Sequence, residues 1–186
     1  MKTIMTLIVI LCCTTISMAQ TKYYSQTKTF YENGYTYQCD VDAGEYITLY
    51  NKDNKLTYVN LTYNGSQRLP PIGVFGRIPF ITNDEQMLPT AWDIVYNAFT
   101  KAQRLKMVEA RLSIALCISK DTGKVMEVKF NFYTWDTLNT IPIATFRKIE
   151  TEIKDKIKIT PLEEAKKLNY IFYGWNQPIT IRYEDR

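Results

Sequence analysis

Histidine is absent from the 186 residues of the chain. A Ser-His-Asp or Cys-His catalytic arrangement is therefore impossible, and so is any zinc or iron site that depends on imidazole ligands. Carboxylate pairs and the chemistry of lysine or tyrosine stay open, but no spacing in the sequence points to a site built from them. We expect no catalytic residue, no metal site and no cofactor, so the sequence favours a protein that is not an enzyme.

Long hydrophobic runs are also missing, apart from one short run at the amino terminus. Residues 4–15 carry no charge and follow Lys2, and Ser17-Met18-Ala19 places small side chains at the two positions that a signal peptidase must fit. This is the layout of a secretory signal peptide, and the run is too short to span a bilayer. We expect residues 1–19 to be removed by cleavage after Ala19, and the mature protein to be periplasmic or secreted.

Neither a second apolar segment nor a block of like charge follows the predicted signal peptide. Beyond residue 20 no stretch approaches the roughly 18 uncharged apolar residues that a transmembrane helix needs. The formal charge of +4 arises from 23 basic and 19 acidic residues, which are spread along the chain. We therefore expect no transmembrane segment after cleavage and no nucleic-acid partner.

Cysteine is scarce, and two of the four cysteines, Cys12 and Cys13, lie in the predicted signal peptide. A lipid anchor on one of them is the less favoured alternative, because Leu11 stands where a lipoprotein signal would have a small residue. Cys39 and Cys117 would remain in the mature chain. They could form a disulfide in an oxidising compartment, or stay as buried thiols, since each lies in a strand-like apolar run. The sequence leaves both interpretations open.

The first part of the mature chain, residues 20–66, is rich in tyrosine. Nine of the fourteen tyrosines lie between Tyr23 and Tyr63. Aromatic and β-branched runs alternate with Glu-Asn-Gly, Asp-Ala-Gly and Asn-Lys-Asp-Asn, which are turn residues at hairpin spacing. We predict an antiparallel β-meander with strands near residues 27–31, 35–41, 45–50 and 55–63.

Two kinds of site are conceivable in this meander. Exposed aromatic rings can hold a sugar, and three tyrosines would project from the face opposite Ile47 and Leu49: Tyr46, Tyr50 and Tyr58. Tyrosine is equally a good strand former whose ring packs while its hydroxyl stays in water. Asp40, Asp42 and Glu45 bring three carboxylates together as a calcium loop does. The later ligands of such a loop are missing, so a hairpin turn is favoured over a metal site.

Residues 67–89 form a long segment with prolines and glycines and no sustained period of either kind. A loop of this length is usually a functional loop or a linker, but a linker should be polar. This one carries apolar residues that we take as candidate binding residues: Ile72, Val74, Phe75, Ile78 and Phe80. They would form either an exposed surface for a partner or a cap over the seam between the two halves of the chain.

Residues 90–186 begin with a predicted helix and a long hairpin. The helix opens at Pro89-Thr90 and ends near Arg104, because apolar side chains recur at helical spacing between them. Apolar residues then occupy every second position over residues 108–118 and again over 126–132, on either side of a Lys-Asp-Thr-Gly-Lys turn. This period predicts two antiparallel strands.

A second helix and a closing strand complete the chain. Asn139 or Thr140 is the expected helix cap, Pro142 lies in the first turn, and the helix continues to residue 157. Glu150 and Lys154 are four residues apart, and we place this ion pair on the outer face. The closing segment, residues 168–183, reads as a strand that is interrupted between Gly174 and Pro178.

Residues 90–183 resemble a known domain in the order of their elements. The hairpin LSIALCISKDTGKVMEVKF, with its turn at Asp121–Val125, is followed by IPIATFRKIETEIKDKIKITP and YIFYGWNQPITIRY. This order is similar to the carboxyl-terminal domain of TonB and its relatives, and the resemblance implies strand addition to a partner. The whole chain also resembles small secreted proteins of unknown function from Bacteroides and related gut bacteria. No proline-rich span follows the first hydrophobic segment, which argues against a direct role in powering an outer-membrane receptor.

The sequence thus predicts an α+β fold with a signal peptide (1–19), a meander (20–66), an apolar loop (67–89) and a helix-hairpin-helix-strand unit (90–186). The meander and the last unit could share one core. The expected function is that of an exported, non-catalytic binding or protein-interaction module of the bacterial envelope. Its partner would be an envelope protein, met through a strand edge or the apolar loop, or a glycan. The alternatives are a carbohydrate-binding accessory protein and a carboxylate-dependent hydrolase.

Overall fold

The computed structural model describes residues 21–68, 80–107 and 109–183. Its strands form one six-stranded sheet with the order β1-β2-β3-β5-β4-β6, and every neighbouring pair is antiparallel. Helices complete this part of the chain, so the fold is α+β as predicted. The elements are β1 (Lys28–Glu32), β2 (Tyr35–Val41), β3 (Tyr46–Asn51), α2 (Asp84–Ala98), α3 (Lys101–Lys106), β4 (Arg111–Ile118), β5 (Val125–Tyr133), the 3₁₀ helix η1 (Thr137–Thr140), α4 (Ile143–Lys156), the 3₁₀ helix η2 (Glu163–Lys167) and β6 (Ile171–Pro178).

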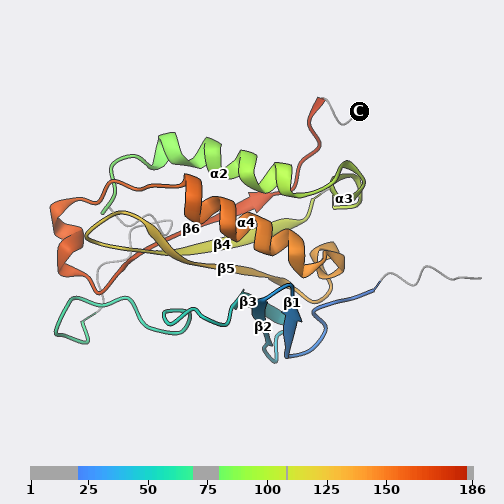
Figure 1. The fold of residues 1–186 in the computed structure, drawn as a ribbon, viewed down its shortest axis with the longest axis horizontal. Helices are drawn as coiled ribbons and strands as arrows, with labels where there is room; N and C mark the ends of the chain where they lie inside the picture. Colours follow the sequence, from blue (N-terminus) through green and yellow to red (C-terminus); the bar gives the residue numbers. More distant parts are fainter. Residues whose placement is uncertain (1–20, 69–79, 108, 184–186) are drawn as a thin grey trace, which may run out of the picture.

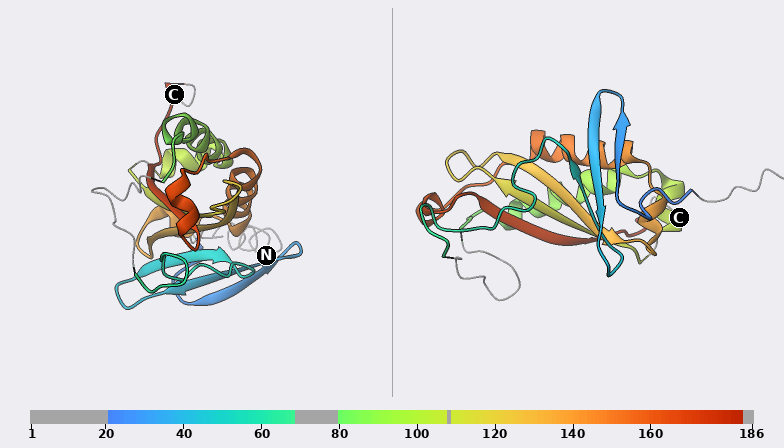
Figure 2. Two further views of the ribbon diagram at one scale, coloured as in Figure 1. Left: turned by 90° about the vertical axis from the view of Figure 1, so that its left-hand side faces the viewer. Right: turned by 90° about the horizontal axis from the view of Figure 1, so that it is seen from below.

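Helices α2 and α4 lie side by side on one face of the sheet (Figure 1). The sheet is strongly twisted, so that β1, β2 and β3 cross β4 and β6 at a steep angle (Figure 2). Alternate residues of the strands point toward the helices and share one buried core with them. Both halves of the chain contribute to this core, which includes Tyr37, Cys39, Ile47, Leu49, Leu112, Ile114, Phe130, Phe132, Ile94, Val95, Phe146, Ile149 and Ile153.

Three strands of the predicted meander and both strands of the predicted hairpin are confirmed within a few residues. The predicted fourth strand of the meander, residues 55–63, is wrong. The edge of β3 that this strand would need is paired with β5, through partners such as Leu49 and Phe130. The backbone N–H groups of Lys55 and Leu56 instead donate to the carboxylate of Glu127, at 2.6 and 2.9 Å. The segment therefore runs over the sheet without joining it.

The first helix starts earlier and breaks sooner than the sequence pattern suggested. It begins at Asp84, so the predicted apolar loop ends before residue 89, and Pro89 lies inside α2 at an exposed position. Phe99 is extended, and Thr100 then starts α3 with a capping box to Gln103. The spacing Thr100-x-x-Gln103 in the sequence indicates a new helix start, because in a capping box each side chain accepts a hydrogen bond from the backbone N–H of the other residue. Within the described ranges no helix is both long and apolar enough to cross a membrane.

The predicted caps of the second helix are also wrong, although the helix itself is confirmed. Pro142 is the residue that precedes α4, and Asn139 serves a different purpose. Its amide is buried, accepts from the backbone N–H of Tyr24 and donates to the carbonyl of Thr134, both at 2.6 Å. The chain that enters β1 is thereby fixed to the loop before α4. Strand β6 runs through Gly174 to Pro178, so the predicted interruption there is wrong.

Glu150 was placed on the outer face of its helix, and the structure corrects this. Its side chain is fully buried where β2 packs against α4. It accepts hydrogen bonds from the hydroxyl of Tyr37, from Arg147 at 3.1 Å and from Lys154 at 2.5 Å. Burial, and next the neighbouring Glu150 charge, raise the pKa of Tyr37, which keeps its hydroxyl protonated as a donor. We call these four residues the Glu150 cluster.

Removal of this carboxylate should cost more than removal of its surface counterpart. Glu150→Ala leaves the buried Tyr37 hydroxyl without its acceptor, which costs about 1–3 kcal/mol, whereas Arg147 and Lys154 are partly exposed and regain water. Glu152→Ala on the same helix breaks the more exposed pair with Lys156 and should cost about 0.5 kcal/mol or less. Urea unfolding of the two variants measures the difference. Equal losses would show that the Glu150 cluster contributes no more than a surface ion pair.

A second test concerns the hairpin turn between β4 and β5. Gly123 has φ +68°, and a Cβ there would lie 1.8 Å from the carbonyl oxygen of Ile159. Gly34 has φ +78° with nothing within 4 Å of its Cβ position, so Gly34→Ala isolates the conformational strain, about 1–2 kcal/mol. Gly123→Ala should destabilise the protein by clearly more than this in thermal unfolding. A similar shift for both would mean that the contact with Ile159 relaxes freely.

Candidate functional site

The sheet face opposite the helices carries a row of polar side chains across four strands. Thr48 on β3 lies opposite Asn131 on β5, which lies opposite Ser113 on β4, which lies opposite Asn176 on β6. Paired residues of neighbouring strands point to the same side, and the strands are spaced about 4.8 Å apart. The amide of Asn131 donates to Thr48 Oγ1 at 2.9 Å. We call this arrangement the polar row.

A hollow of about 450 Å³ lies along the polar row. Two residues further along β4, Ala115 lies opposite Gly174 on β6. Both residues are small, so they leave a space that larger side chains would fill. Tyr46 and Phe172 lie at its margins, and Lys129 lines it as well. The ammonium group of Lys129 donates to the carbonyl of Thr57 at 2.9 Å, within the segment that covers the adjacent part of this face.

Aromatic rings continue this surface beyond the hollow. Tyr46 lies opposite Tyr133, with ring centroids 5.1 Å apart, and the Tyr133 ring stacks on Trp135 at 4.8 Å and 11°. Trp135 is 67% exposed and Tyr133 is 41% exposed. Contiguous exposed aromatic rings form an apolar patch of the kind that marks interaction sites. We use the name open face for the polar row, the hollow and these three rings together.

The other two predicted tyrosines form a separate cluster around Asp40. Tyr50 and Tyr58 donate their hydroxyls to Asp40 Oδ2 at 2.9 and 2.5 Å, and their rings meet edge to face at 5.8 Å. Burial alone would raise the pKa of Asp40, but hydrogen bonds from Tyr58, Gln38 and Tyr50 outweigh it and lower the pKa below its ordinary value. Burial, followed by the bond to Asp40, raises the pKa of Tyr50 to about 12. The structure therefore brings only Tyr46 of the three into the open face.

Of the three carboxylates compared with a calcium loop, Asp42 is occupied within its own turn. Asp42 Oδ1 accepts from the backbone N–H groups of Gly44 and Tyr46, at 2.8 and 2.9 Å. Glu45 adopts φ +60° in the same turn. Among the described residues no group of three or more acidic, cysteine or histidine side chains is placed to hold a metal ion.

Of the five predicted binding residues in the apolar loop, four lie outside the described residues: Ile72, Val74, Phe75 and Ile78. Phe80 is buried in the core, and its carbonyl accepts from the backbone N–H of Leu162 at 2.8 Å. The prediction of Phe80 as a binding residue is therefore wrong, and its packing agrees with the capping alternative.

The two remaining cysteines are free and buried, so the disulfide that the sequence left open is not formed. Cys39 lies opposite Leu49 on the face covered by the helices. Cys117 lies opposite Glu127 on the other face and three strands further along the sheet order. Burial raises the pKa of each thiol to about 12, which leaves both as unreactive packing residues at neutral pH.

Sequence reasoning missed most of the open face. Tyr133, Trp135 and the four residues of the polar row were not selected, although Ser113 and Asn131 are polar positions within strongly alternating strands. Such polar positions are usual on a wet sheet face. Their significance depends on the pairing of β3 with β5 and of β4 with β6, which joins segments far apart in the sequence.

The Asp40 cluster makes stability depend on pH in a definite direction. Because its folded pKa is lowered, ionised Asp40 stabilises the fold above the ordinary aspartate pKa of about 3.9, and this contribution is lost as the pH falls through the folded value. Asp40→Asn should therefore lower the free energy of unfolding at neutral pH and lose that deficit in acid. Unfolding experiments along a pH series measure this, with the exposed Asp155→Asn as the control. A deficit that persists unchanged in acid would contradict the assignment.

Comparisons with known proteins agree with this architecture. A family described as a domain of unknown function, DUF5043, matches residues 20–175. The chain is also similar to the crystal structure of a DUF5043 family protein from Bacteroides uniformis ATCC 8492, with 42% identity and a TM-score of 0.79 over 87% of this chain and 96% of that one. None of the curated proteins matches. The family match covers most of the chain, and the solved structure spans the same fold. The protein therefore belongs to the DUF5043 family.

Proposed function

We propose that this protein is an exported, non-catalytic binding module of the bacterial envelope, and that its ligand lies on the open face. The observation that carries the proposal is the polar row, in which Thr48, Asn131, Ser113 and Asn176 stand next to exposed stacked rings. A binding site typically combines apolar or aromatic surface with a few fixed polar groups. The layout of residues 1–19 supports export.

The chemistry of the open face favours a saccharide as the ligand. Hydroxyl and amide side chains donate and accept hydrogen bonds, as sugar hydroxyls require. The rings of Tyr133 and Trp135 offer an apolar surface on which the C–H face of a sugar ring can pack. Lys129 is engaged with the carbonyl of Thr57, so the surface offers mainly neutral groups to a ligand. A neutral glycan matches it better than an acidic one.

One of the two carboxylates that line a described hollow has a structural role. Asp53 and Glu127 line one hollow together, beside Arg147 and Lys154. Glu127 accepts hydrogen bonds from backbone N–H groups of the segment that follows β3, which gives it a structural role.

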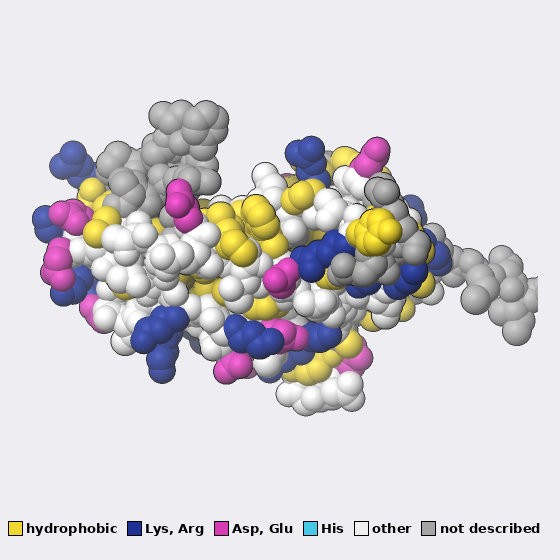
Figure 3. Space-filling model, turned by 90° about the horizontal axis from the view of Figure 1, so that it is seen from above, with side chains coloured by type: hydrophobic (Ala, Val, Ile, Leu, Met, Phe, Trp, Pro, Cys, Tyr) yellow, Lys and Arg dark blue, Asp and Glu magenta, His cyan; other side chains and the backbone are white. Residues whose placement is uncertain are grey.

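On the face seen from the α2 side, basic and acidic side chains are interspersed without a block of one sign (Figure 3). This distribution supports the expectation that nucleic acid is not the partner.

A second candidate partner is an envelope protein that adds a strand to the sheet. Strand β6 is the last strand in the sheet order, and no other described strand pairs with its outer edge. An outer edge of this kind presents backbone N–H and C=O groups to an extended segment of a partner. The resemblance of residues 90–183 to the TonB carboxyl-terminal domain favours this mode.

The open face can be blocked by a larger side chain at Gly174. A Cβ at Gly174 would have ordinary contacts, the nearest 3.4 Å away at the Ile114 carbonyl oxygen and the Phe172 ring, so Gly174→Val fills the hollow from β6. Trp135→Ala removes the exposed ring and should weaken saccharide binding by about tenfold. Affinity gel electrophoresis of residues 20–186 in neutral polysaccharides, with a glycan array, measures retention.

The control is Tyr183→Ala, which removes another exposed ring, beyond β6. It should bind as the unchanged protein does, and all variants should melt cooperatively. Absence of retention for the unchanged protein would refute the saccharide site, and so would retention of Gly174→Val and Trp135→Ala equal to that of the unchanged protein. Capture of the same envelope protein by the unchanged protein and by Gly174→Val would favour the β6 edge instead.

A further inference from the structure

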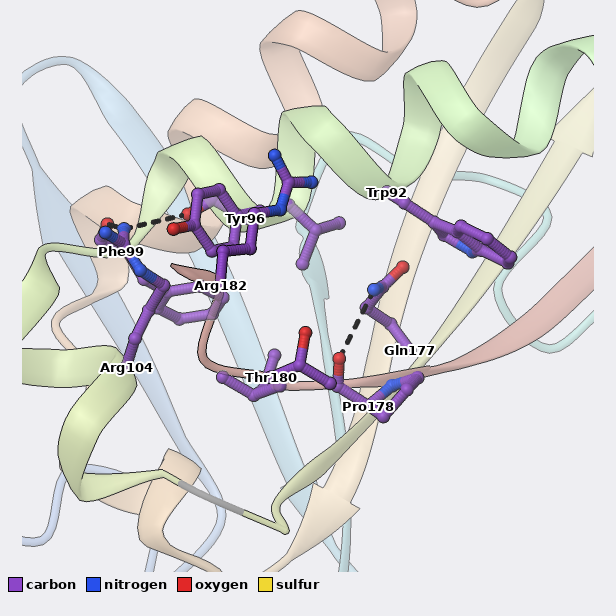
Figure 4. Close-up of a pocket in the computed structure, with 10 residues that line it drawn as sticks. Trp92, Tyr96, Phe99, Arg104, Gln177, Pro178, Thr180 and Arg182 are labelled. Carbon is purple, nitrogen blue, oxygen red and sulfur yellow. Dashed lines mark hydrogen bonds between the residues drawn. The ribbon is translucent and has the colours of Figure 1, made fainter. Parts of the chain in front are cut away.

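A second pocket lies on the helix side of the sheet, away from the open face. It occupies about 320 Å³ between α2, Arg104 of α3, and the chain that ends β6 and continues beyond it (Figure 4). Gln177 marks the side of the sheet, because it lies opposite Leu112, a residue of the core. Ten described residues line the pocket: Trp92, Val95, Tyr96, Phe99, Arg104, Gln177, Pro178, Ile179, Thr180 and Arg182.

The walls of the pocket are apolar and already in place. Val95, Phe99 and Ile179 are each at most 4% exposed. Trp92 lines the pocket with 46% of its surface exposed. The amide of Gln177 is held from both sides, since its oxygen accepts from the indole N–H of Trp175 at 3.2 Å and its nitrogen donates to the Pro178 carbonyl.

One side of the pocket concentrates positive charge. The guanidinium carbons of Arg104 and Arg182 lie 4.1 and 3.8 Å from the centroid of the Tyr96 ring. Arg104 also donates to the carbonyls of Phe99 and Tyr96, and Arg182 pairs with Asp93. These contacts fix the two groups in position. A guanidinium has five N–H donors, so it can serve a ligand oxygen together with such partners.

One acidic residue lies beside this end of the pocket, since Asp93 pairs with Arg182 from outside the lining set. Arg104 and Arg182 are the charged members of the ten described residues around the pocket, and none of the ten is acidic. An apolar cavity with cations at one end is complementary to a molecule with an apolar body and an anionic head. Its volume is at the lower end of the range for small-molecule sites, which limits the ligand to a short chain or one ring.

We propose that this pocket binds a small amphipathic carboxylate, a medium-chain fatty acid or an arylalkanoic acid. The apolar body lies against Val95, Phe99 and Ile179, beneath the Trp92 ring. The carboxylate faces Arg104 and Arg182. This site is separate from the open face, and the proposal does not depend on the saccharide ligand.

The test compares two probes of equal length that differ in charge. Isothermal titration of residues 20–186 with octanoate and with octanol should show clearly tighter binding of octanoate. Arg182→Gln should weaken octanoate by about tenfold and leave octanol unchanged, because it removes a charge-assisted contact. Thr180→Trp places a large ring at an exposed lining position and should abolish both. Arg68→Gln, at an exposed position outside the lining set, is the control and should change neither.

Several outcomes would overturn the proposal. Equal affinity for octanoate and octanol in the unchanged protein would remove the role of the arginines, and this comparison needs no variant to fold. Full octanoate affinity in Thr180→Trp would place the ligand elsewhere. Absence of binding for both probes would refute the pocket as a site, while saccharide retention by the open face would remain a separate result.

Discussion

The structure depends on one buried carboxylate that joins its two halves. Glu150 of α4 holds the hydroxyl of Tyr37 on β2, and its charge is balanced by Arg147 and Lys154 from the same helix. A buried carboxylate tolerates its loss of water only when such partners surround it. The meander is therefore tied to the helix layer at one defined place. The right-handed twist that strands adopt in any sheet carries β1, β2 and β3 around while β3 stays paired with β5.

A single sheet with this twist gives its two faces different chemistry. Residues that alternate along each strand send apolar side chains to α2 and α4 and leave polar or small ones on the other side. The segment after β3 covers part of that other side through Glu127 and Lys129. What remains open is the polar row and the rings beside it. The open face is thus a consequence of incomplete coverage, with Gly174 and Ala115 as the residues that keep it hollow.

Local patterns in the sequence were enough to predict most elements but not their pairing. The alternation of apolar and polar residues on either side of Gly123 predicted the β4–β5 hairpin, and the helical spacing of apolar residues predicted the buried face of α4. The segment 55–63 has strand-forming residues, yet no free edge was available to it once β3 had paired with β5. Glu150 looked like a surface residue, since an i,i+4 pair with Lys154 is the pattern of a solvated helix face. In both cases a contact between distant segments overrode the local signal.

The two candidate sites also could not be predicted from local sequence patterns. Both sites include residues of strand β6. Asn176 lies in the polar row opposite Ser113, and the next residue, Gln177, lies in the arginine-lined pocket. A slip of one residue between β4 and β6 would exchange these two faces. The register is fixed at both ends of β6, where the Asn169 amide bonds to Thr62 and Asn60 and the Ile179 N–H bonds to Ala110. Both surfaces therefore depend on contacts between segments far apart in the sequence, which is why neither could be assembled from the sequence around its lining residues.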